Sequence, residues 1–227
     1  MGDAFLRTKL LIGDKSFEKL KKSKVAVFGV GGVGSYAVEA LARAGVGMID
    51  IFDGDKVDIT NINRQVIAMH DTIGISKVEV MKKRMLNINP EIIVGAHECV
   101  FNASNSENYD FSPYDYIVDA IDMISSKILI IEKSKKLGKK VISSMGMGNK
   151  INPTMIEVAD VFSTSICPLA RVMRRELKKR GVDSLKVVYS KEKPLYTPDD
   201  KVNASISFVP SGAGLIIASE VVKDIIF

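Results

Sequence analysis

The sequence predicts an α/β fold: a Rossmann-like, mostly parallel sheet with helices on both faces and a C-terminal extension. Between residues 24 and 144, short apolar segments alternate with segments of helical periodicity, which is the pattern of βαβ units. The first apolar segment runs directly into a glycine-rich loop that opens a helix, as in nucleotide-binding folds. The chain of 227 residues has the length of one large domain of this class.

The expected elements follow from these patterns and from the residues that end them. Up to Gly148, strands are expected at 24–29, 48–53, 91–96, 114–119 and 140–144, and helices at 36–45, 75–89 and 123–138. Beyond Gly148 the rhythm changes, with strands expected at 155–161, 185–189 and 204–209, helices at 168–180 and 212–227, and a polar loop at 190–200. We therefore predict a single domain, 1–227, with a nucleotide-binding core (1–150) and a C-terminal substrate-side elaboration (151–227).

The composition excludes several classes of protein. Hydrophobic residues make up 46% of the chain and charged residues 26%, which is ordinary for a globular protein and excludes disorder. The chain has two cysteines, which exclude a disulfide framework and a four-cysteine zinc site. Residues 1–24 lack the apolar core of a signal peptide, and no uncharged apolar stretch is long enough to span a bilayer. We expect a soluble, cytoplasmic protein with no membrane partner.

The glycine-rich loop predicts a phosphate-binding site. The segment GVGGVGS carries the pattern G-x-G-x-x-G at Gly29, Gly31 and Gly34, and Gly32 is a further glycine in the same loop. Glycines let the backbone approach a phosphate closely, and the N-terminus of the following helix offers free N–H groups. Asp53 ends the second expected strand, where a carboxylate accepts hydrogen bonds from a ribose. The alternative is a tight strand–helix turn without a ligand.

The polar residues after this loop favour a triphosphate over a nicotinamide dinucleotide. A hydride-transfer site needs an apolar slot for nicotinamide rather than a cluster of cations, although the glycines and Asp53 suit both ligands equally well. Arg64 and Lys77 resemble a clamp for the phosphates of ATP. The fourth expected strand closes with Asp119 and Asp122 at the carboxyl end of the sheet, where a carboxylate can hold Mg²⁺ against the phosphates.

Each of these residues also has an ordinary structural explanation. Arg64 is compatible with a surface helix, Lys77 with a solvated helix face, and Asp122 with the N-cap of the helix that begins at Met123. Their joint order along the chain, in which the glycine loop is followed by Asp, N-x-N-R-Q, Lys and D-x-x-D, argues against separate coincidences.

In this order the motifs resemble those of the ubiquitin-activating-like adenylyltransferase superfamily, which includes the ThiF and molybdopterin-synthase adenylyltransferase proteins. The resemblance covers about residues 5–148. In that family the matching positions bind ATP and Mg²⁺, and here they are Gly31, Asp53, Asn61, Arg64, Lys77 and Asp122. Arg7, in F-L-R-T-K, looks like the arginine that family members insert into the neighbouring subunit's ATP site. The alternative for Arg7 is a basic residue on a frayed terminus. The resemblance implies a homodimer whose catalytic residues include Arg7, Arg64, Lys77 and Asp122.

Two departures from the family pattern narrow the resemblance. The branch that activates sulfur carriers usually carries two CxxC pairs for structural zinc, and this chain has none. The usual Asp-Asn pair after the fourth strand is Asp122-Met123 here, so the Asn contribution to nucleotide binding is absent. With ALARAGVG, VDAIDMISSK, INPT and CPLARVMRRELKKRGV, these features look most like the tRNA threonylcarbamoyladenosine dehydratase subfamily. Members of that subfamily use ATP to activate a carboxylate on a modified tRNA adenosine and then cyclise it.

A basic stripe is expected on the helix at 168–180. Its members share one helix face at i, i+3, i+4 and i+7, and they are Arg171, Arg174, Arg175 and Lys178. Residues 169–194 hold nine basic and three acidic residues, whereas the whole chain has a net charge of only +5. Glu176 alone offsets the cluster within the helix. An unneutralised patch of this kind suits the phosphate backbone of a tRNA. The alternative is an ordinary solvated helix face.

Cys167 is the candidate nucleophile, because it precedes Pro168 at an expected helix start, where a helix dipole lowers a thiol pKa. No histidine stands near it in the sequence, so a structural or incidental cysteine is favoured. Cys99 is expected in the core. The function we expect is ATP-dependent adenylylation of a carboxylate by a ligase-type enzyme that cyclises N6-threonylcarbamoyladenosine in tRNA. The alternatives are an adenylyltransferase for the C-terminus of a ubiquitin-like sulfur carrier and a nicotinamide-binding Rossmann module, and a sulfur-relay partner is left open.

Overall fold

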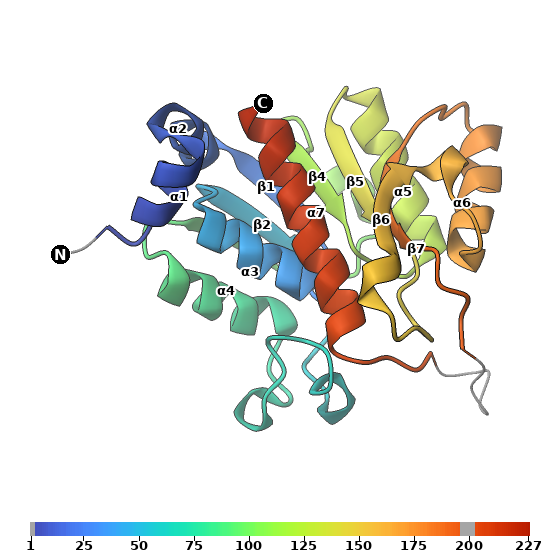
Figure 1. The fold of residues 1–227 in the computed structure, drawn as a ribbon, viewed down its shortest axis with the longest axis horizontal. Helices are drawn as coiled ribbons and strands as arrows, with labels where there is room; N and C mark the ends of the chain where they lie inside the picture. The colour runs from blue at the N-terminus through green and yellow to red at the C-terminus, as the bar shows by residue number, and fades with distance from the viewer. Residues whose placement is uncertain (1–2, 196–202) are drawn as a thin grey trace.

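The computed structural model describes residues 3–195 and 203–227, which form a seven-stranded sheet flanked by helices (Figure 1). The strands are β1 (Lys24–Phe28), β2 (Met48–Phe52), β3 (Ile93–His97), β4 (Tyr116–Asp119), β5 (Lys140–Ser144), β6 (Ile156–Asp160) and β7 (Lys186–Ser190). Their order in the sheet is β3-β2-β1-β4-β5-β7-β6. Every neighbouring pair is parallel except β6 with β7, so the predicted α/β fold with a mostly parallel sheet is confirmed.

Helices cover both faces of this sheet, as predicted. The helices are α1 (Leu6–Ile12), α2 (Asp14–Lys22), α3 (Gly34–Ala44), α4 (Lys77–Ile88), α5 (Ile124–Lys136), α6 (Pro168–Lys179) and α7 (Phe208–Ile226). Helices α3, α4 and α7 pack on one face, and α5 and α6 pack on the other (Figure 1). No helix within the described residues is long and apolar enough to cross a bilayer.

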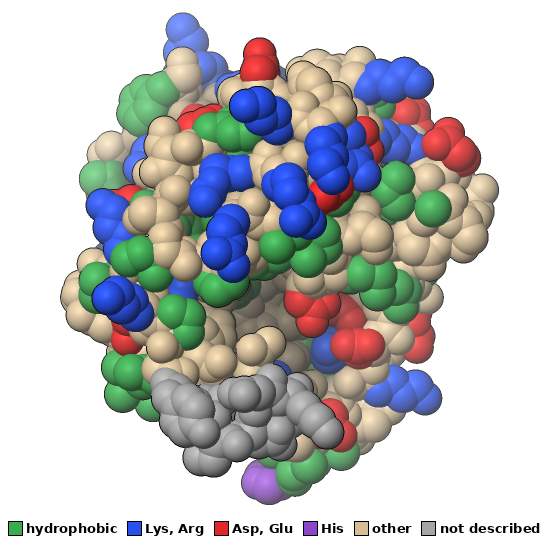
Figure 2. All heavy atoms as spheres, turned by 90° about the vertical axis from the view of Figure 1, so that its right-hand side faces the viewer, with side chains coloured by type: hydrophobic (Ala, Val, Ile, Leu, Met, Phe, Trp, Pro, Cys, Tyr) green, Lys and Arg blue, Asp and Glu red, His purple; other side chains and the backbone are tan. Residues whose placement is uncertain are grey.

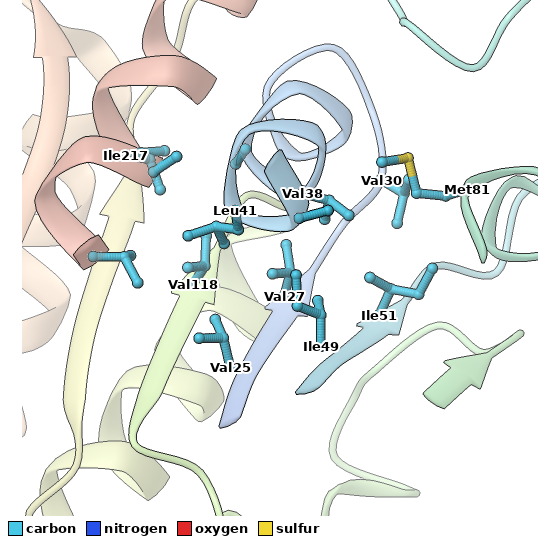
Figure 3. Close-up of a cluster of buried hydrophobic side chains, with 14 of the residues drawn as sticks. Val25, Val27, Val30, Val38, Leu41, Ile49, Ile51, Met81, Val118 and Ile217 are labelled. Carbon is cyan, nitrogen blue, oxygen red and sulfur yellow. The ribbon is translucent and has the colours of Figure 1, made fainter. Parts of the chain in front are cut away.

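Strand β1 shows how the sequence builds a core on each side of the sheet. Successive side chains of a strand point to opposite faces. Val25 and Val27 therefore join Leu41 of α3 in the first core, which Figure 3 shows. Ala26 and Phe28 join the second core, under α5 and α6. A strand buried on both faces has a continuous apolar sequence, which explains why this element was predictable.

Most predicted elements end within two residues of their predicted bounds, but the predicted strand at 204–209 is wrong. Residues 203–206 have no regular structure, and the helix that follows begins at Phe208, four residues before its predicted start. Ala204 instead exchanges hydrogen bonds with Asn149, since its N–H donates to Oδ1 and its carbonyl accepts from the backbone N–H, both at 2.7 Å. Pro210 lies in the first turn of α7, where a helix tolerates proline. The predicted loop at 190–200 lies partly outside the described residues.

The N-terminal segment forms two helices, α1 and α2, for which the sequence had given no element prediction. Helix α2 buries only Phe17 and Leu20, and most of its other residues are charged. Helix α1 buries no residue at all. Helix α1 is short and exposes its leucines, and α2 buries only two apolar residues, so neither has the sequence pattern of a helix with a wide buried face.

Helix α7 packs directly on α3, the helix that follows the glycine loop. A Cβ added to Gly214 would lie 2.3 Å from the carbonyl oxygen of Val33 and 3.0 Å from the backbone nitrogen of Ala37. Only a glycine lets the two backbones approach this closely. The C-terminal helix therefore supports the first turn of α3 from outside the sheet.

Candidate active site

A cavity of about 800 Å³ opens at the carboxyl ends of the strands. It lies where β1 and β4 are neighbours and the chain turns from one side of the sheet to the other, which is the usual ligand site of such sheets. One end of the cavity, the phosphate end, is lined by the glycine loop and by residues after β2. The other end, the acyl end, is lined by Ser144 to Lys150 after β5 and by Cys167 to Leu169 at the start of α6.

The glycine loop has the tight geometry that its sequence predicted. Gly29 has φ +90°, and a Cβ there would lie 2.8 Å from the carbonyl oxygen of Ala120. A Cβ on Gly34 would lie 1.8 Å from the carbonyl oxygen of Gly29, so this position also requires glycine. Gly29, Gly31 and Gly32 line the cavity, whereas Gly34 begins α3 behind them. The loop therefore presents its backbone to the cavity.

Asp53 fastens the end of β2 to this loop. Its Oδ2 accepts a hydrogen bond of 2.7 Å from the Val30 N–H, and its Oδ1 accepts one of 2.9 Å from the Asp55 N–H. Burial raises the pKa of the Asp53 carboxyl, against the opposing effects of Lys77 and of these backbone donors. Each carboxylate oxygen keeps a second lone pair, so Asp53 can still accept a hydrogen bond from a ribose hydroxyl.

Two cations line the phosphate end. Arg64 follows the 3-10 helix η1 (Ile59–Asn61), and its Nη1 donates to the carbonyl oxygen of Thr60 at 2.7 Å. Lys77 is the first residue of α4; it is 5% exposed, and its Nζ lies 2.7 Å from Asp55 Oδ2. Lys77 is therefore not on a solvated helix face, and Arg64, which is partly exposed, lies in a turn rather than on a surface helix.

Asn61 and Gln65 complete this wall. The side-chain oxygen of Asn61 accepts from the Asp58 N–H at 3.1 Å, which holds η1 in place. Gln65 is 6% exposed and lines the cavity, and its Oε1 has no hydrogen-bond partner among the described residues. Sequence reasoning did not assign Gln65 to the site, although it stands next to Arg64 in the N-x-N-R-Q segment.

Asp119 and Asp122, three residues apart, occupy different environments. Asp122 is exposed in the cavity wall and bonds to no other described residue. The alternative of Asp122 as an N-cap is wrong, because the N-cap of α5 is Met123 and no side chain caps it. Asp119 is fully buried, 3.0 Å from Lys127 Nζ, and accepts 2.6 Å from the Ser143 hydroxyl. Asp119 thus holds the loop that presents Asp122, and it does not line the cavity.

The donor set suits a magnesium ion held together with a nucleotide. No group of three or more His, Cys, Asp or Glu residues that could hold a metal occurs in the part of the chain that the structure describes. Magnesium, however, is usually bound by one or two carboxylates plus substrate phosphates and waters. The free Asp122 carboxylate, at the cavity that the glycine loop also lines, fits that mode.

The predicted residues outside the cavity are Arg7 and the basic stripe. Arg7 lies exposed on α1 and forms no ion pair with a described residue. Arg171, Arg175 and Lys178 are exposed on α6, and Lys and Arg side chains gather beside a hollow on the side where α6 lies (Figure 2). Arg174 differs, because it is half-buried and its Nη1 donates to the Thr164 carbonyl at 2.9 Å.

Glu176 does not neutralise the whole basic stripe. Hydrogen bonds from Arg180, Lys179 and Arg175 lower the pKa of Glu176 to about 2. Arg171, Arg174 and Lys178 form no ion pair with any residue in 3–195 or 203–227. The exposed part of the stripe therefore keeps most of its positive charge.

The acyl end contains Cys167, the candidate nucleophile of the sequence analysis, and Lys150, which sequence reasoning did not assign to the site. Cys167 is 2% exposed, lies at the N-cap of α6 and lines the cavity. Cys99, expected in the core, is only partly buried and lines the cavity too, but beside Gly54 at the phosphate end. Lys150 is 4% exposed, and its Nζ donates to the carbonyl oxygens of Gly146 at 2.9 Å and Ser190 at 3.4 Å. No periodicity marks such a lysine, because it lies in a loop.

Comparison with known proteins places this fold and cavity in a family. The model of the ThiF family matches residues 6–226. The chain belongs to the ThiF family. In this ThiF-family protein the match includes α7, which lies beyond the residues that carried the resemblance in the sequence.

Individual relatives are similar over nearly the whole length. The tRNA threonylcarbamoyladenosine dehydratase of Bacillus subtilis is 42% identical over 239 residues, covering 98% of this chain and 94% of the relative. The structure of Escherichia coli tRNA N6-threonylcarbamoyladenosine dehydratase TcdA in complex with AMP has a TM-score of 0.92 at 32% identity, covering 99% and 96% of the two chains. Its complex with ATP has a TM-score of 0.91 at 33% identity, covering 98% and 93%.

Proposed function

We propose that this protein uses ATP to activate a carboxylate, and that its substrate is N6-threonylcarbamoyladenosine in tRNA, which it dehydrates to a cyclic product. The observation that carries the proposal is the convergence of the glycine loop, Arg64, Lys77 and Asp122 on one cavity. Support also comes from relatives of matching length that are named as this dehydratase and whose structures contain AMP or ATP.

The reaction has two steps. A carboxylate oxygen of the substrate attacks the α-phosphorus of ATP, and pyrophosphate leaves with the electrons of the broken bond. A nitrogen of the same nucleoside then attacks the acyl carbon and loses its proton, and AMP leaves as the ring closes. The substrate loses the elements of one water. These elements end up in AMP and pyrophosphate, whose formation from ATP takes up one water.

The residues of the phosphate end act by position and charge. Backbone N–H groups of the glycine loop and the start of α3 bind phosphate oxygens, while Asp53 accepts from the ribose. Arg64 and Lys77 stabilise the negative charge that grows on the phosphates, with Asn61 beside them. Asp122 would hold Mg²⁺, whose chemistry is to neutralise the phosphate oxygens and orient them for displacement.

The protein is proposed to act as a cytoplasmic homodimer with Arg7 reaching the partner's nucleotide. Arg7 is exposed on α1 and does not line the cavity of its own chain. The same helix exposes Leu6, Leu10 and Leu11 at 53%, 77% and 85%, an apolar surface that a second copy would cover. Variant Arg7→Ala in a dimer mixed with Asp122→Ala subunits would regain activity in only one of the two sites if Arg7 acts in trans.

The tRNA is proposed to bind along the basic stripe, so that residues 151–227 form the substrate side of the domain. The exposed cations of α6 keep their charge, and α6 begins at the acyl end of the cavity, where Cys167 and Pro168 line the wall. A phosphate backbone held on α6 would bring its modified base toward that end. No covalent role is assigned to Cys167.

One experiment separates this function from its rivals. Purified protein with Mg²⁺ and ATP should form AMP only when tRNA carrying threonylcarbamoyladenosine is present, and the tRNA nucleoside should lose 18 Da, the mass of one water. AMP formation that requires a small carrier protein instead of tRNA would replace this function with sulfur-carrier activation. Tight binding of NAD and no binding of ATP in calorimetry would exclude both.

A further inference from the structure

Three lysines that are buried among the described residues differ in the groups that neutralise their charge. Lys127 lies 3.0 Å from Asp119, and Lys77 lies 2.7 Å from Asp55. Lys150 is as buried as these two, at 4% exposure, but it forms no ion pair with a described residue. Its ammonium group donates only to the carbonyl oxygens of two backbone positions. Lys150 therefore stands apart as a buried charge without a bound carboxylate.

Two groups near Lys150 act on its charge without bonding to it. These groups are Cys167 on the N-cap of α6 and Glu192 after β7. The Glu192 carboxylate accepts hydrogen bonds from the backbone N–H groups of Ile151 and Asn152, at 2.8 to 3.1 Å. Burial lowers the pKa of the Lys150 ammonium, with Cys167 and Glu192 acting in the opposite direction. A buried ammonium with no carboxylate bonded to it is costly, and an anion bound beside it lowers that cost.

Lys150 lies at the opposite end of the cavity from the phosphate cations. Its bond to Ser190 places it at the end of β7, beyond β5, whereas Arg64 and Lys77 lie beside the loops after β1 and β2. Among the described residues, Lys150 is the one cationic side chain that lines the acyl end of the cavity. An anion that enters this end meets Lys150 alone.

We propose that Lys150 binds the carboxylate of the substrate that is to be adenylylated. This inference rests on the proposed function, in which the phosphate end holds ATP and the acyl end receives the modified base. An ammonium group has three donors, and two of them already bond to the carbonyl oxygens of Gly146 and Ser190. The third donates to a carboxylate oxygen in the acyl end, and the pair lasts until that oxygen bonds to phosphorus and the carboxylate loses its charge.

The pairing makes Lys150 a specificity residue. The carboxylate is the group that distinguishes a substrate tRNA from the same tRNA without the modification. Because the ion pair exists before the reaction and is lost during it, Lys150 strengthens substrate binding more than it stabilises the transition state. Removing the charge should therefore raise KM for the tRNA without lowering kcat.

The test compares the wild type with Lys150→Met and Lys150→Arg. Steady-state AMP formation is measured against the concentration of tRNA carrying threonylcarbamoyladenosine, and binding of Mg·ATP is measured by calorimetry. We expect Lys150→Met to raise KM by about 10- to 100-fold, as for a lost charged hydrogen bond, and to leave the Kd for ATP unchanged. Lys150→Arg keeps the charge and should recover part of the loss. In the wild type, KM should rise with pH as the ammonium deprotonates, and in Lys150→Met it should not.

Several outcomes would overturn this role. A weaker Kd for ATP in Lys150→Met would assign the lysine to the phosphates, and a fall in kcat at constant KM would make it a proton acceptor. Equal loss of binding to modified and unmodified tRNA would show that Lys150 does not bind the carboxylate. If Lys150→Met fails to fold, the wild type decides: a preference in Kd for modified over unmodified tRNA that falls as the pH rises supports the role, and a preference that does not change with pH contradicts it. Absence of AMP formation in the wild type would overturn the proposed function itself, whereas unchanged kinetics in Lys150→Met would overturn only this inference.

Discussion

The two ends of the cavity differ in how their charges are neutralised. At the phosphate end, Lys77 is held by Asp55, and the loop that presents Asp122 is held by the Asp119–Lys127 pair behind it. At the acyl end, Lys150 is held only by backbone carbonyls. The Asp119–Lys127 pair is thus neutralised within the chain and holds the shape of the site, whereas Lys150 has no carboxylate bonded to it. This difference can be tested by removing each kind of charge.

The largest effect is expected from Asp122→Ala. Asp122 lines the cavity without a bond to another described residue, so its loss removes no structural contact but removes the carboxylate proposed to hold Mg²⁺. We expect kcat for AMP formation to fall by at least about 10²-fold, as when a group that stabilises transition-state charge is lost. The melting temperature should stay within experimental error. Asp71→Ala, an exposed carboxylate outside the cavity, is the matched control, and retained turnover in Asp122→Ala would remove this residue from the site.

Removing a paired lysine should destabilise the fold far more than removing the unpaired one. Lys127→Met leaves the buried Asp119 carboxylate without its cation, which typically costs about 3–5 kcal/mol of unfolding free energy. Lys150→Met breaks no ion pair but removes a donor from two backbone carbonyls, so its change in unfolding free energy should be smaller, about 1–2 kcal/mol. Urea denaturation of both variants measures the difference. Equal destabilisation would mean that Lys150 is as structural as Lys127.

The basic stripe should matter for tRNA and not for ATP. Arg171→Glu combined with Lys178→Glu reverses two exposed cations of α6 that form no ion pair with a described residue. We expect tRNA binding at low salt to weaken by about tenfold or more, and the slope of binding against salt to fall by about 2. Lys15→Glu with Lys22→Glu on α2 makes the same charge change elsewhere. If both double variants bind tRNA with the same affinity, the stripe is only a solvated helix face.

The smallest effect is expected at Glu39 of α3, whose carboxylate accepts a hydrogen bond from Arg84 of α4. Burial disfavours the charged form of Glu39, but hydrogen bonds from Arg84 and Arg43 outweigh it and lower its pKa. A lowered pKa adds stability above the ordinary value of 4.5, and this stability is lost as the pH falls through the folded-state pKa. Glu39→Gln should therefore lower the unfolding free energy by about 1–2 kcal/mol at pH 7. Urea titrations at pH 7 and pH 3 check this, because the difference from wild type should shrink as the pH falls.

The sequence predicted best where a side chain's role follows from its position along the chain. The strand before the loop is buried on both faces, and Gly29 and Gly34 have no room for a Cβ, so both leave a clear sequence pattern. Residues 204–209 were predicted as a strand because their apolar content suits either element. The hydrogen bonds of Ala204 to Asn149, far away in the sequence, decide the outcome.

The acyl end could not be predicted in the same way. Lys150 becomes distinctive only through burial and through the absence of a carboxylate beside it, and both depend on how the segment after β5 packs against β7. Asp119 and Asp122 look equivalent in the sequence, yet one is buried with Lys127 and the other lines the cavity. The sequence indicates which residue types are present, whereas packing decides which of them keep a free charge.

The contact at Gly214 links the last helix of the structure to the first nucleotide-binding turn. During synthesis, the strands and the glycine loop leave the ribosome before α7 does, and α3 then lacks the backbone against which Val33 rests. The loop can therefore reach its final form only after the segment around Gly214 has emerged. A chain interrupted before that point would retain every residue proposed to bind phosphate and still lack the support that holds them in place.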